Sequence, residues 1–137
     1  MKEVSAYLNF DGTCREAMTF YQSCLGGELF VMTFGDSNFG ETPEDKKRLI
    51  HARLKSGPTM VLASDTMPGM PLHAGNNVWL HLTCERDDEV DTTYAALSAG
   101  GKPIMPPHDA FWGARFAMFA DRFGINWMLN HERVKHG

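Results

Sequence analysis

Two histidines stand within short apolar segments where their side chains could take part in chemistry. His51 lies in residues 49–53 and His81 lies in residues 79–83, and both segments alternate in the manner of a half-buried strand. A neutral imidazole can donate or accept a hydrogen bond, so either histidine could orient an anionic or carbonyl ligand. The alternative is that each imidazole bonds only to a neighbouring group within its own sheet.

A single arginine follows an aromatic hinge. Arg115 comes directly after residues 111–114, whose sequence is Phe-Trp-Gly-Ala. A guanidinium at this place could clamp the paired oxygens of a carboxylate or phosphonate, with Trp112 as an apolar wall. The alternative is a salt bridge from Arg115 to Asp109 or Asp121.

The stretch 121–130 is typical of a tight turn centred on Gly124, followed by a strand. The alternation predicts a buried apolar face made of Ile125, Trp127 and Leu129. The opposite face carries the side chains of Asn126, Met128 and Asn130. Because the first face must be buried, the amides and the thioether of the second are free to line a pocket. We expect this strand to form a closing hairpin with the preceding segment at the mouth of a cavity.

The length, net charge and composition of the chain argue against several classes of function. A chain of 137 residues is long enough to bury the core of one domain. Its net charge of −4 argues against a nucleic-acid partner, because phosphate contacts need a basic face. No apolar run reaches membrane length, which argues against a membrane partner. The chain has three cysteines, Cys14, Cys24 and Cys84, and no C-x-x-C pair. Because an odd set of this kind does not suggest a disulfide framework, we expect reduced thiols and a cytoplasmic location.

The first half of the chain predicts one helix among four strands. The strands are expected at residues 4–10, 28–34, 49–55 and 60–65. The helix is expected to begin after Thr13, the predicted N-cap with Glu16 as its capping-box partner, and to end at Gly26-Gly27. Residues 35–48 are predicted to form an exposed loop or short helical turn, and residues 67–77 a linker.

The same order of elements begins again after the linker. A helix is expected at 87–99, and strands are expected at 78–84, 102–105, 115–120 and 126–130. Three prolines, Pro103, Pro106 and Pro107, are expected to keep the second of these strands short. His108 is then expected in a loop and His131 in a solvated tail.

The two halves match in pattern. The Gly-Gly pairs begin at residues 26 and 100, an offset of 74. When the two halves are aligned with this offset, Tyr7 corresponds to His81. We therefore predict an α+β fold, a single domain over 1–137. It consists of tandem βαβββ modules at 1–66 and 77–137 that form a curled mixed sheet.

Five segments resemble those of a known family. They are residues 7–10 (Tyr-Leu-Asn-Phe), 25–28 (Leu-Gly-Gly-Glu), 50–52 (Ile-His-Ala), 110–113 (Ala-Phe-Trp-Gly) and the closing stretch 121–130. With them the chain resembles the vicinal-oxygen-chelate (VOC) superfamily, which includes glyoxalase I, extradiol dioxygenases and bleomycin resistance proteins. Within it, the chain is similar to the PhnB-like branch. The resemblance implies paired βαβββ modules and commonly a homodimer, but it does not imply one reaction.

The metal-dependent relatives take four ligands from the first, fourth, fifth and eighth strands, usually His or Glu. The matching positions in this chain are Ser5, Val61, Trp79 and Met128. A shift by one pleat gives Tyr7, Ala63, His81 and Asn130. Neither set supplies the several nitrogen or oxygen donors that a divalent ion needs, so no metal and no other cofactor is expected.

We therefore expect a protein that binds a small organic ligand in a metal-free cup, in which catalytic residues cannot be assigned. The predicted ligand-binding residues are Tyr7, Asn9, His51, Trp79, His81, Trp112, Arg115, Met128 and Asn130. One alternative is a metal-dependent lyase, isomerase or dioxygenase whose ligands are displaced from the usual register. Another is a vestigial cup with a working dimer surface.

Overall fold

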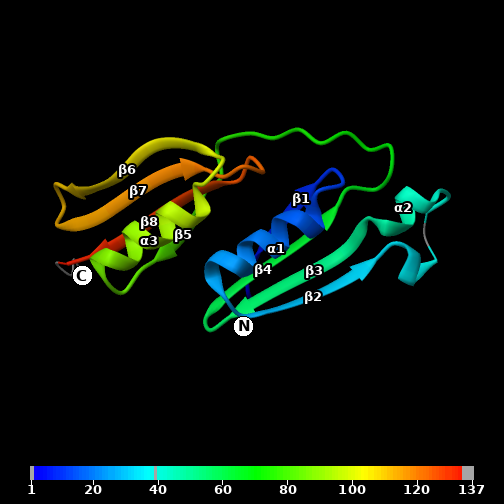
Figure 1. Cartoon of the computed structure of the whole chain (residues 1–137), viewed down its shortest axis with the longest axis horizontal. Helices are drawn as coiled ribbons and strands as arrows, with labels where there is room; N and C mark the ends of the chain where they lie inside the picture. The colour runs from blue at the N-terminus through cyan, green and yellow to red at the C-terminus, as the bar shows by residue number, and fades with distance from the viewer. Residues whose placement is uncertain (1, 39, 134–137) are drawn as a thin grey trace. The chain divides into compact units, whose positions relative to one another are not determined.

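A computed structural model describes residues 2–38 and 40–133, so the last four residues of the predicted second module lie outside it. The chain divides into two compact units, Met1–His73 and Ala74–Gly137. Each unit contains a four-stranded mixed sheet with a longer helix packed on it (Figure 1). The α+β architecture of tandem βαβββ modules is confirmed, and each module makes its own hydrogen-bonded sheet. No helix in the described ranges is long and apolar enough to cross a membrane.

The first unit follows the predicted order of elements. They are β1 (Ala6–Phe10), α1 (Cys14–Leu25), β2 (Glu28–Thr33), η1 (Gly35–Ser37), α2 (Pro43–Lys47), β3 (Leu49–Ser56) and β4 (Thr59–Asp65). The sheet order is β1-β4-β3-β2, with β1 parallel to β4 and the other pairs antiparallel. The short helices η1 and α2 occupy the segment that was predicted to be an exposed loop or helical turn.

The start of α1 corrects the predicted capping box. Thr13 occupies the N-cap position, but its side chain accepts no capping hydrogen bond. The Asp65 carboxylate at the end of β4 serves this turn instead: its Oδ1 accepts from the N–H groups of Gly12 (2.8 Å) and Cys14 (3.0 Å). Its Oδ2 accepts from the Leu49 N–H at 2.9 Å. A buried tertiary carboxylate therefore replaces the local cap, because it satisfies three donors from the turn before α1 and from the start of β3.

The second unit repeats the order. It consists of β5 (Leu80–Thr83), α3 (Asp87–Leu97), β6 (Lys102–Ala110), β7 (Ala114–Ala120) and β8 (Asn126–Glu132). The sheet order is β5-β8-β7-β6, with β5 parallel to β8. This matches the strand arrangement of the first unit element for element.

Two strands of the second unit are longer than predicted. β6 continues through Pro103, Pro106 and Pro107 to Ala110, so His108 lies in a strand and not in a loop. An edge strand tolerates proline because one side of its backbone needs no partner, and the β6–β7 register shifts twice along the proline segment. β8 also runs on to Glu132, which places His131 in the sheet and not in a solvated tail.

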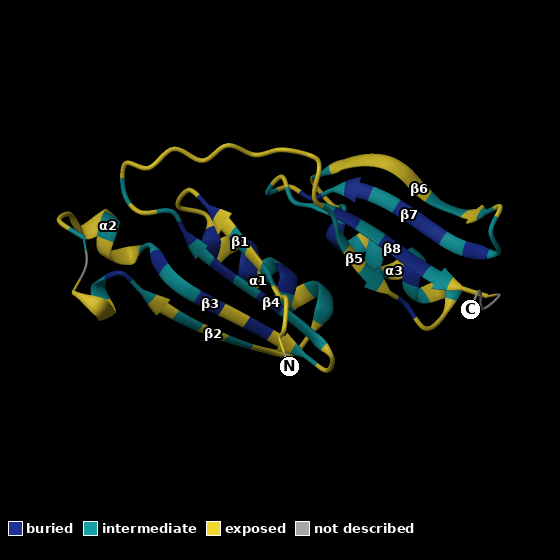
Figure 2. Ribbon diagram, turned by 180° about the vertical axis from the view of Figure 1, so that it is seen from behind, coloured by how far each residue is buried: buried dark blue, intermediate teal, exposed yellow. Residues whose placement is uncertain are grey.

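Each unit has its core between the sheet and the longer helix. Buried residues concentrate on the central strands β3 and β4 in the first unit and on β7 and β8 in the second (Figure 2). In the first unit α1 packs Ala17, Met18 and Tyr21 against this face. In the second, Trp127 and Leu129 are buried, as the alternation of residues 125–129 predicted.

The repeated Gly-Gly pairs have a common steric cause. A Cβ atom on Gly27 would overlap the Lys55 carbonyl oxygen and lie 2.6 Å from the Cβ of Ser56. A Cβ on Gly101 would likewise overlap the Ala120 carbonyl oxygen. In both units the chain after the helix passes so close to the end of a neighbouring strand, β3 in the first unit and β7 in the second, that only glycine fits.

Candidate functional site

The sheet of the first unit presents polar and aromatic side chains on the face opposite α1, called here the open face. Tyr7 and His51 meet on it, with 3.2 Å between the Tyr7 hydroxyl and His51 Nδ1. The Ser64 hydroxyl donates to Asn9 Oδ1 at 3.4 Å. Three of the predicted ligand-binding residues therefore share this face, and each has a partner on it.

The open face of the second unit is set by the register of β5, β8 and β7. His81 lies beside Met128, and Thr83 lies beside Asn130. On the other side of β8, Asn130 lies opposite Phe116 of β7. The predicted residues His81, Met128 and Asn130 are therefore brought together on one face.

A pocket of about 480 Å³ lies at the carboxyl ends of the parallel strands β5 and β8. Its lining residues are His81, Thr83, Cys84, Glu85, Asn130, His131 and Glu132. Asn130 is only 8% exposed, and its side-chain oxygen Oδ1 is buried without a hydrogen-bond partner. An unsatisfied buried acceptor costs about 1–3 kcal/mol, and native structures contain few of them.

Two of the other groups that line this pocket, His131 and Cys84, are already engaged or neutral. His131 Nδ1 donates to the Cys84 carbonyl at 3.0 Å. Burial, reinforced by the negative charge of Glu89, raises the pKa of the Cys84 thiol to about 11. The thiol therefore stays protonated at neutral pH and is a poor nucleophile and metal ligand. Burial also raises the pKa of Cys14 to about 12, which makes it an inert core thiol.

Arg115 does not join this group. It alternates with Phe116, so its side chain leaves β7 on the face that α3 covers. Its guanidinium binds Asp91 of α3 at 3.0 Å and Asp109 at 3.2 Å. The salt bridge to Asp109 was one of the predicted alternatives, whereas the second partner is Asp91 and not Asp121.

Two predicted tryptophans lie at the ends of strands. Trp79 precedes β5, and its indole N–H donates to the Asn76 carbonyl at 2.8 Å. Trp112, in the β6–β7 turn, packs edge-on against Phe116 with 5.2 Å between ring centroids. The Trp112 ring therefore extends the aromatic surface that begins beside Asn130.

The whole pattern of strands and helices has known counterparts. A family model described as the glyoxalase/bleomycin resistance protein/dioxygenase superfamily matches residues 6–129. The chain belongs to this superfamily. Protein YjdN of Escherichia coli K12 is 29% identical over 143 residues, which cover 93% of each chain.

Solved structures of this superfamily agree with the fold. PA1353 from Pseudomonas aeruginosa is 39% identical, with a TM-score of 0.86 over 96% of this chain and 98% of that one. A Bacillus cereus PhnB protein, described as a putative 3-demethylubiquinone-9 3-methyltransferase, has a TM-score of 0.78 at 22% identity. It covers 95% of this chain and 99% of that one, and at this identity it supports the fold alone. The superfamily predicted from the sequence is confirmed, and the PhnB-like branch stays a prediction.

The divalent metal of the enzymes in this superfamily does not fit the residues found here. No group of three or more His, Cys, Asp or Glu side chains within 2–38 and 40–133 is placed to hold a metal ion. At the strand positions that supply ligands in metal-dependent relatives, His81 pairs with Met128, a thioether that suits soft metals better than Mg²⁺ or Mn²⁺.

Sequence reasoning missed six residues of the second unit's open face and pocket. They are Thr83, Cys84, Glu85, Phe116, His131 and Glu132. Thr83 shares the alternation of His81, which was a usable signal. The placement of Phe116 required the β7–β8 register, which depends on the geometry of the turn between them.

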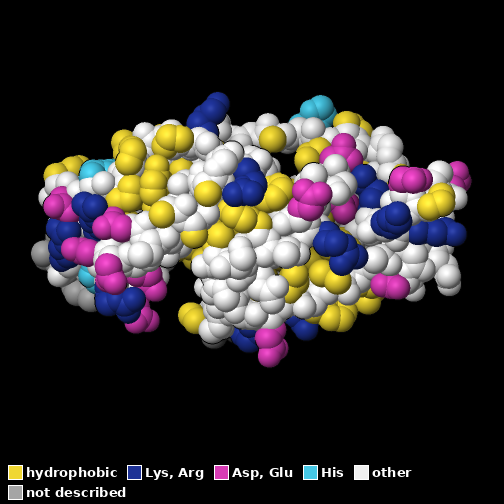
Figure 3. Space-filling model, in the orientation of Figure 1, with side chains coloured by type: hydrophobic (Ala, Val, Ile, Leu, Met, Phe, Trp, Pro, Cys, Tyr) yellow, Lys and Arg dark blue, Asp and Glu magenta, His cyan; other side chains and the backbone are white. Residues whose placement is uncertain are grey.

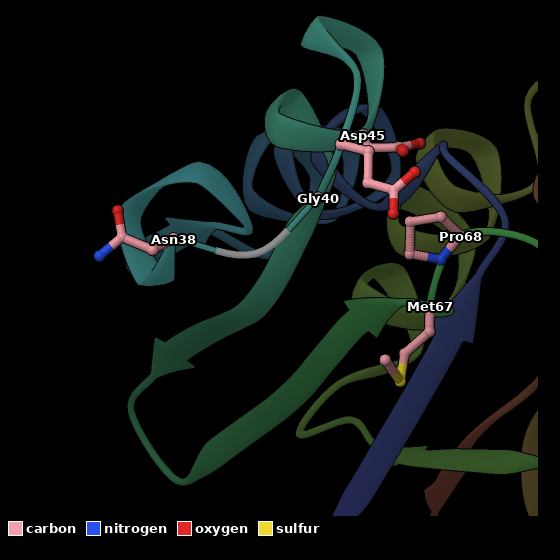
Figure 4. Close-up of a pocket in the computed structure, with 6 residues that line it drawn as sticks. Asn38, Gly40, Asp45, Met67 and Pro68 are labelled. Carbon is pink, nitrogen blue, oxygen red and sulfur yellow. The ribbon is translucent and has the colours of Figure 1, made fainter.

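A second pocket, of about 550 Å³, lies in the first unit (Figure 4). Its lining residues are Asn38, Gly40, Glu41, Asp45, Met67 and Pro68, none of them predicted to bind a ligand. Asp45, Met67 and Pro68 lie near one another, whereas the Asn38 amide points away from them (Figure 4). Although it is larger, this pocket holds no buried polar group without a partner among its described residues, so the site is assigned to the second unit's pocket.

Proposed function

We propose that this protein binds a small organic molecule in the second unit's pocket, without the divalent metal of its enzymatic relatives. One observation carries the proposal. Asn130 lines a pocket of about 480 Å³ and is only 8% exposed, and its buried side-chain oxygen Oδ1 has no hydrogen-bond partner. A polar group left unsatisfied in this way is stabilised when a bound molecule donates a hydrogen bond to it.

The surroundings of Asn130 suit an organic ligand. Thr83 and His81 supply hydroxyl and imidazole groups from β5, and Met128 supplies a soft apolar surface. Phe116, opposite Asn130 in the strand register, and the Trp112 ring packed against it form an aromatic surface beside the pocket lining. A few polar groups beside apolar walls are typical of small-molecule sites.

The test compares the wild type with Asn130→Leu, a replacement of similar volume. The variant removes the unsatisfied oxygen, so we expect the free protein to become more stable by about 1 kcal/mol in urea unfolding. We expect the same variant to lose the response to ligands. The probes are benzylamine, benzyl alcohol and benzoate, each followed by two-dimensional NMR of the backbone and side-chain amides.

A matched control is Asn9→Leu, on the exposed first-unit face. We expect this variant to keep the ligand response. If the three probes shift the signals of Asn130→Leu as they shift those of the wild type, the assignment of the site to Asn130 is wrong. A stoichiometric divalent ion in protein purified without chelators, lost in His81→Ala, would favour a metal-dependent enzyme instead.

We also propose a homodimer in the cytoplasm. The family resemblance supports the dimer, as do the exposed apolar side chains Tyr7, Phe30 and Met32 on the first unit's open face. The buried free thiols of Cys14 and Cys84 support a reducing compartment. Sedimentation equilibrium should give twice the 15.3 kDa of the chain, and a single-chain mass at all concentrations would contradict the dimer.

A further inference from the structure

We propose that the pocket of the second unit selects a molecule that carries a protonated amine on an aromatic or apolar body. This inference rests on the proposed function, because it names the class of ligand for the same site. It begins from the charge of the lining, which among the residues that the structure describes contains the carboxylates of Glu85 and Glu132 and neither lysine nor arginine.

No positively charged side chain among the described residues neutralises these two carboxylates. Neither Glu85 nor Glu132 forms a salt bridge within the described part of the chain. Arg133, next to Glu132 in sequence, is held by Asp87 at 2.7 Å and by Asp109 at 2.6 Å. The pocket therefore keeps its negative charge.

Arg115 and Arg133 are committed to one network, Asp87–Arg133–Asp109–Arg115–Asp91, and Arg86 pairs with Asp88 at 3.1 Å. Figure 3 shows acidic and basic side chains gathered together over the part of the second unit that carries the C-terminus. Since each guanidinium of the network already has two carboxylate partners, neither is available to bind an anionic ligand in the pocket.

The buried polar group of the pocket has the matching chemistry. Asn130 Oδ1 is a hydrogen-bond acceptor without a donor, and Asn130 is 8% exposed. An ammonium group has three donors and no acceptor, so it can serve Oδ1 and the two carboxylates together. A carboxylate or phosphonate ligand would instead meet two like charges and an acceptor.

The body of the ligand is constrained by the neighbouring aromatic surface. Phe116 lies opposite Asn130 in the β7–β8 register, and the Trp112 ring packs against it. An aromatic or apolar group attached to the amine would cover these rings. A cation close to their faces would gain a further favourable interaction.

The test uses three probes of nearly equal shape and different charge: benzylamine, benzyl alcohol and benzoate. Each is titrated into the whole chain, and dissociation constants are taken from NMR shifts of the Asn130 side-chain amide and its neighbours. We expect benzylamine to bind at least about three-fold more tightly than benzyl alcohol, and benzoate to bind most weakly. The preference for the amine should shrink at high salt.

Two variants connect the preference to the carboxylates. Glu85→Gln and Glu132→Gln keep the size of each side chain and remove its charge. We expect each to weaken benzylamine binding about two- to five-fold and to leave benzyl alcohol binding unchanged. Asp88→Asn is the matched control, because Asp88 is an exposed acid of the same unit that does not line the pocket.

The outcomes separate this inference from the proposed function. If benzyl alcohol or benzoate shifts the Asn130 amide signal with a dissociation constant no larger than that of benzylamine, the amine preference is wrong, but the binding site is supported. If both Gln variants bind benzylamine like the wild type, the preference is also wrong. If none of the three probes perturbs the amide, both the inference and the proposed function are overturned.

Discussion

The two units have the same strand order but treat their polar side chains differently. Behind each sheet, one buried aspartate collects three N–H donors: Asp65 in the first unit and Asp121 in the second. On the open faces the units differ. Tyr7 and His51 are hydrogen-bonded to each other in the first unit, whereas Asn130 Oδ1 has no partner in the second.

This difference separates structural polar groups from those available to a ligand. A buried carboxylate whose oxygens all accept hydrogen bonds stabilises the fold and has little capacity left for chemistry. A buried amide oxygen without a partner lowers stability, and such local conflicts are expected at functional sites. The comparison therefore favours the second unit's face as the one that recognises a ligand.

The largest expected effect tests the feature that the two units share, a buried aspartate that accepts three hydrogen bonds. Asp65→Ala removes the acceptor of three N–H groups, two of them in buried hydrogen bonds, so we expect a loss of about 3 kcal/mol in the free energy of unfolding. Asp121→Ala should cost about 2 kcal/mol, since only its bond from Trp127 Nε1 is fully buried. Urea unfolding followed by circular dichroism measures both.

A more conservative variant serves as the control. Asp65→Asn keeps one acceptor oxygen for Gly12 and Cys14 but turns an NH₂ group toward the Leu49 N–H. We expect it to recover part of the stability that Asp65→Ala loses. If Asp65→Ala were as stable as the wild type, the two aspartates would not be equivalent supports of the two units.

Much of the fold could be predicted because it follows from local patterns. The alternation in residues 125–129 correctly gave the buried side chains Trp127 and Leu129. The first Gly-Gly pair marked the end of α1, whereas α3 ends at Leu97 and not at residue 99 as predicted. The structure adds the steric reason for Gly27 and Gly101. Such signals are readable since each depends on residues that are close in the sequence.

The site depends on contacts that local patterns do not specify. Placing Arg115 required the β7–β8 register, because a shift by one residue exchanges the two faces of a strand. The N-terminal support of α1 comes from Asp65, 51 residues beyond Cys14, so Thr13 was a reasonable but wrong capping group. β6 can continue through its prolines because it lies at the edge of the sheet. This edge position is known only from the order of the strands in the structure.

A smaller effect should appear in acid, and mainly in the second unit. The hydrogen bonds from Arg133, and from Arg115 to Asp109, hold the pKa of Asp87 and of Asp109 below the ordinary value of 3.8. The folded state therefore favours the ionised carboxylates. Their stabilising contribution is complete well above pH 3.8 and is lost as the pH falls through the lowered pKa values. When the pH is lowered from 5 to below 3.8, we expect Arg133→Gln to lose less of its free energy of unfolding than the wild type.

Tryptophan fluorescence suits this measurement, because all three tryptophans, Trp79, Trp112 and Trp127, lie in the second unit. The matched control is Arg86→Gln, which removes an exposed ion pair with Asp88 in the same unit. We expect this control to keep the acid dependence of the wild type. An unchanged acid dependence in Arg133→Gln would show that the network of ion pairs does not distinguish the second unit.

The smallest expected effect falls on the open face of the first unit. Tyr7→Phe removes the hydroxyl that pairs with His51 Nδ1 across 3.2 Å at an exposed position, so we expect a stability loss of about 0.5 kcal/mol or less. Benzylamine binding, measured by NMR titration, should be unchanged, because the Tyr7–His51 pair is satisfied without a ligand. Loss of binding in Tyr7→Phe together with normal binding in Asn130→Leu would reverse the roles of the two faces. The ligand would then be recognised by side chains that exchange one hydrogen-bond partner for another, and an unsatisfied buried group would not mark the site.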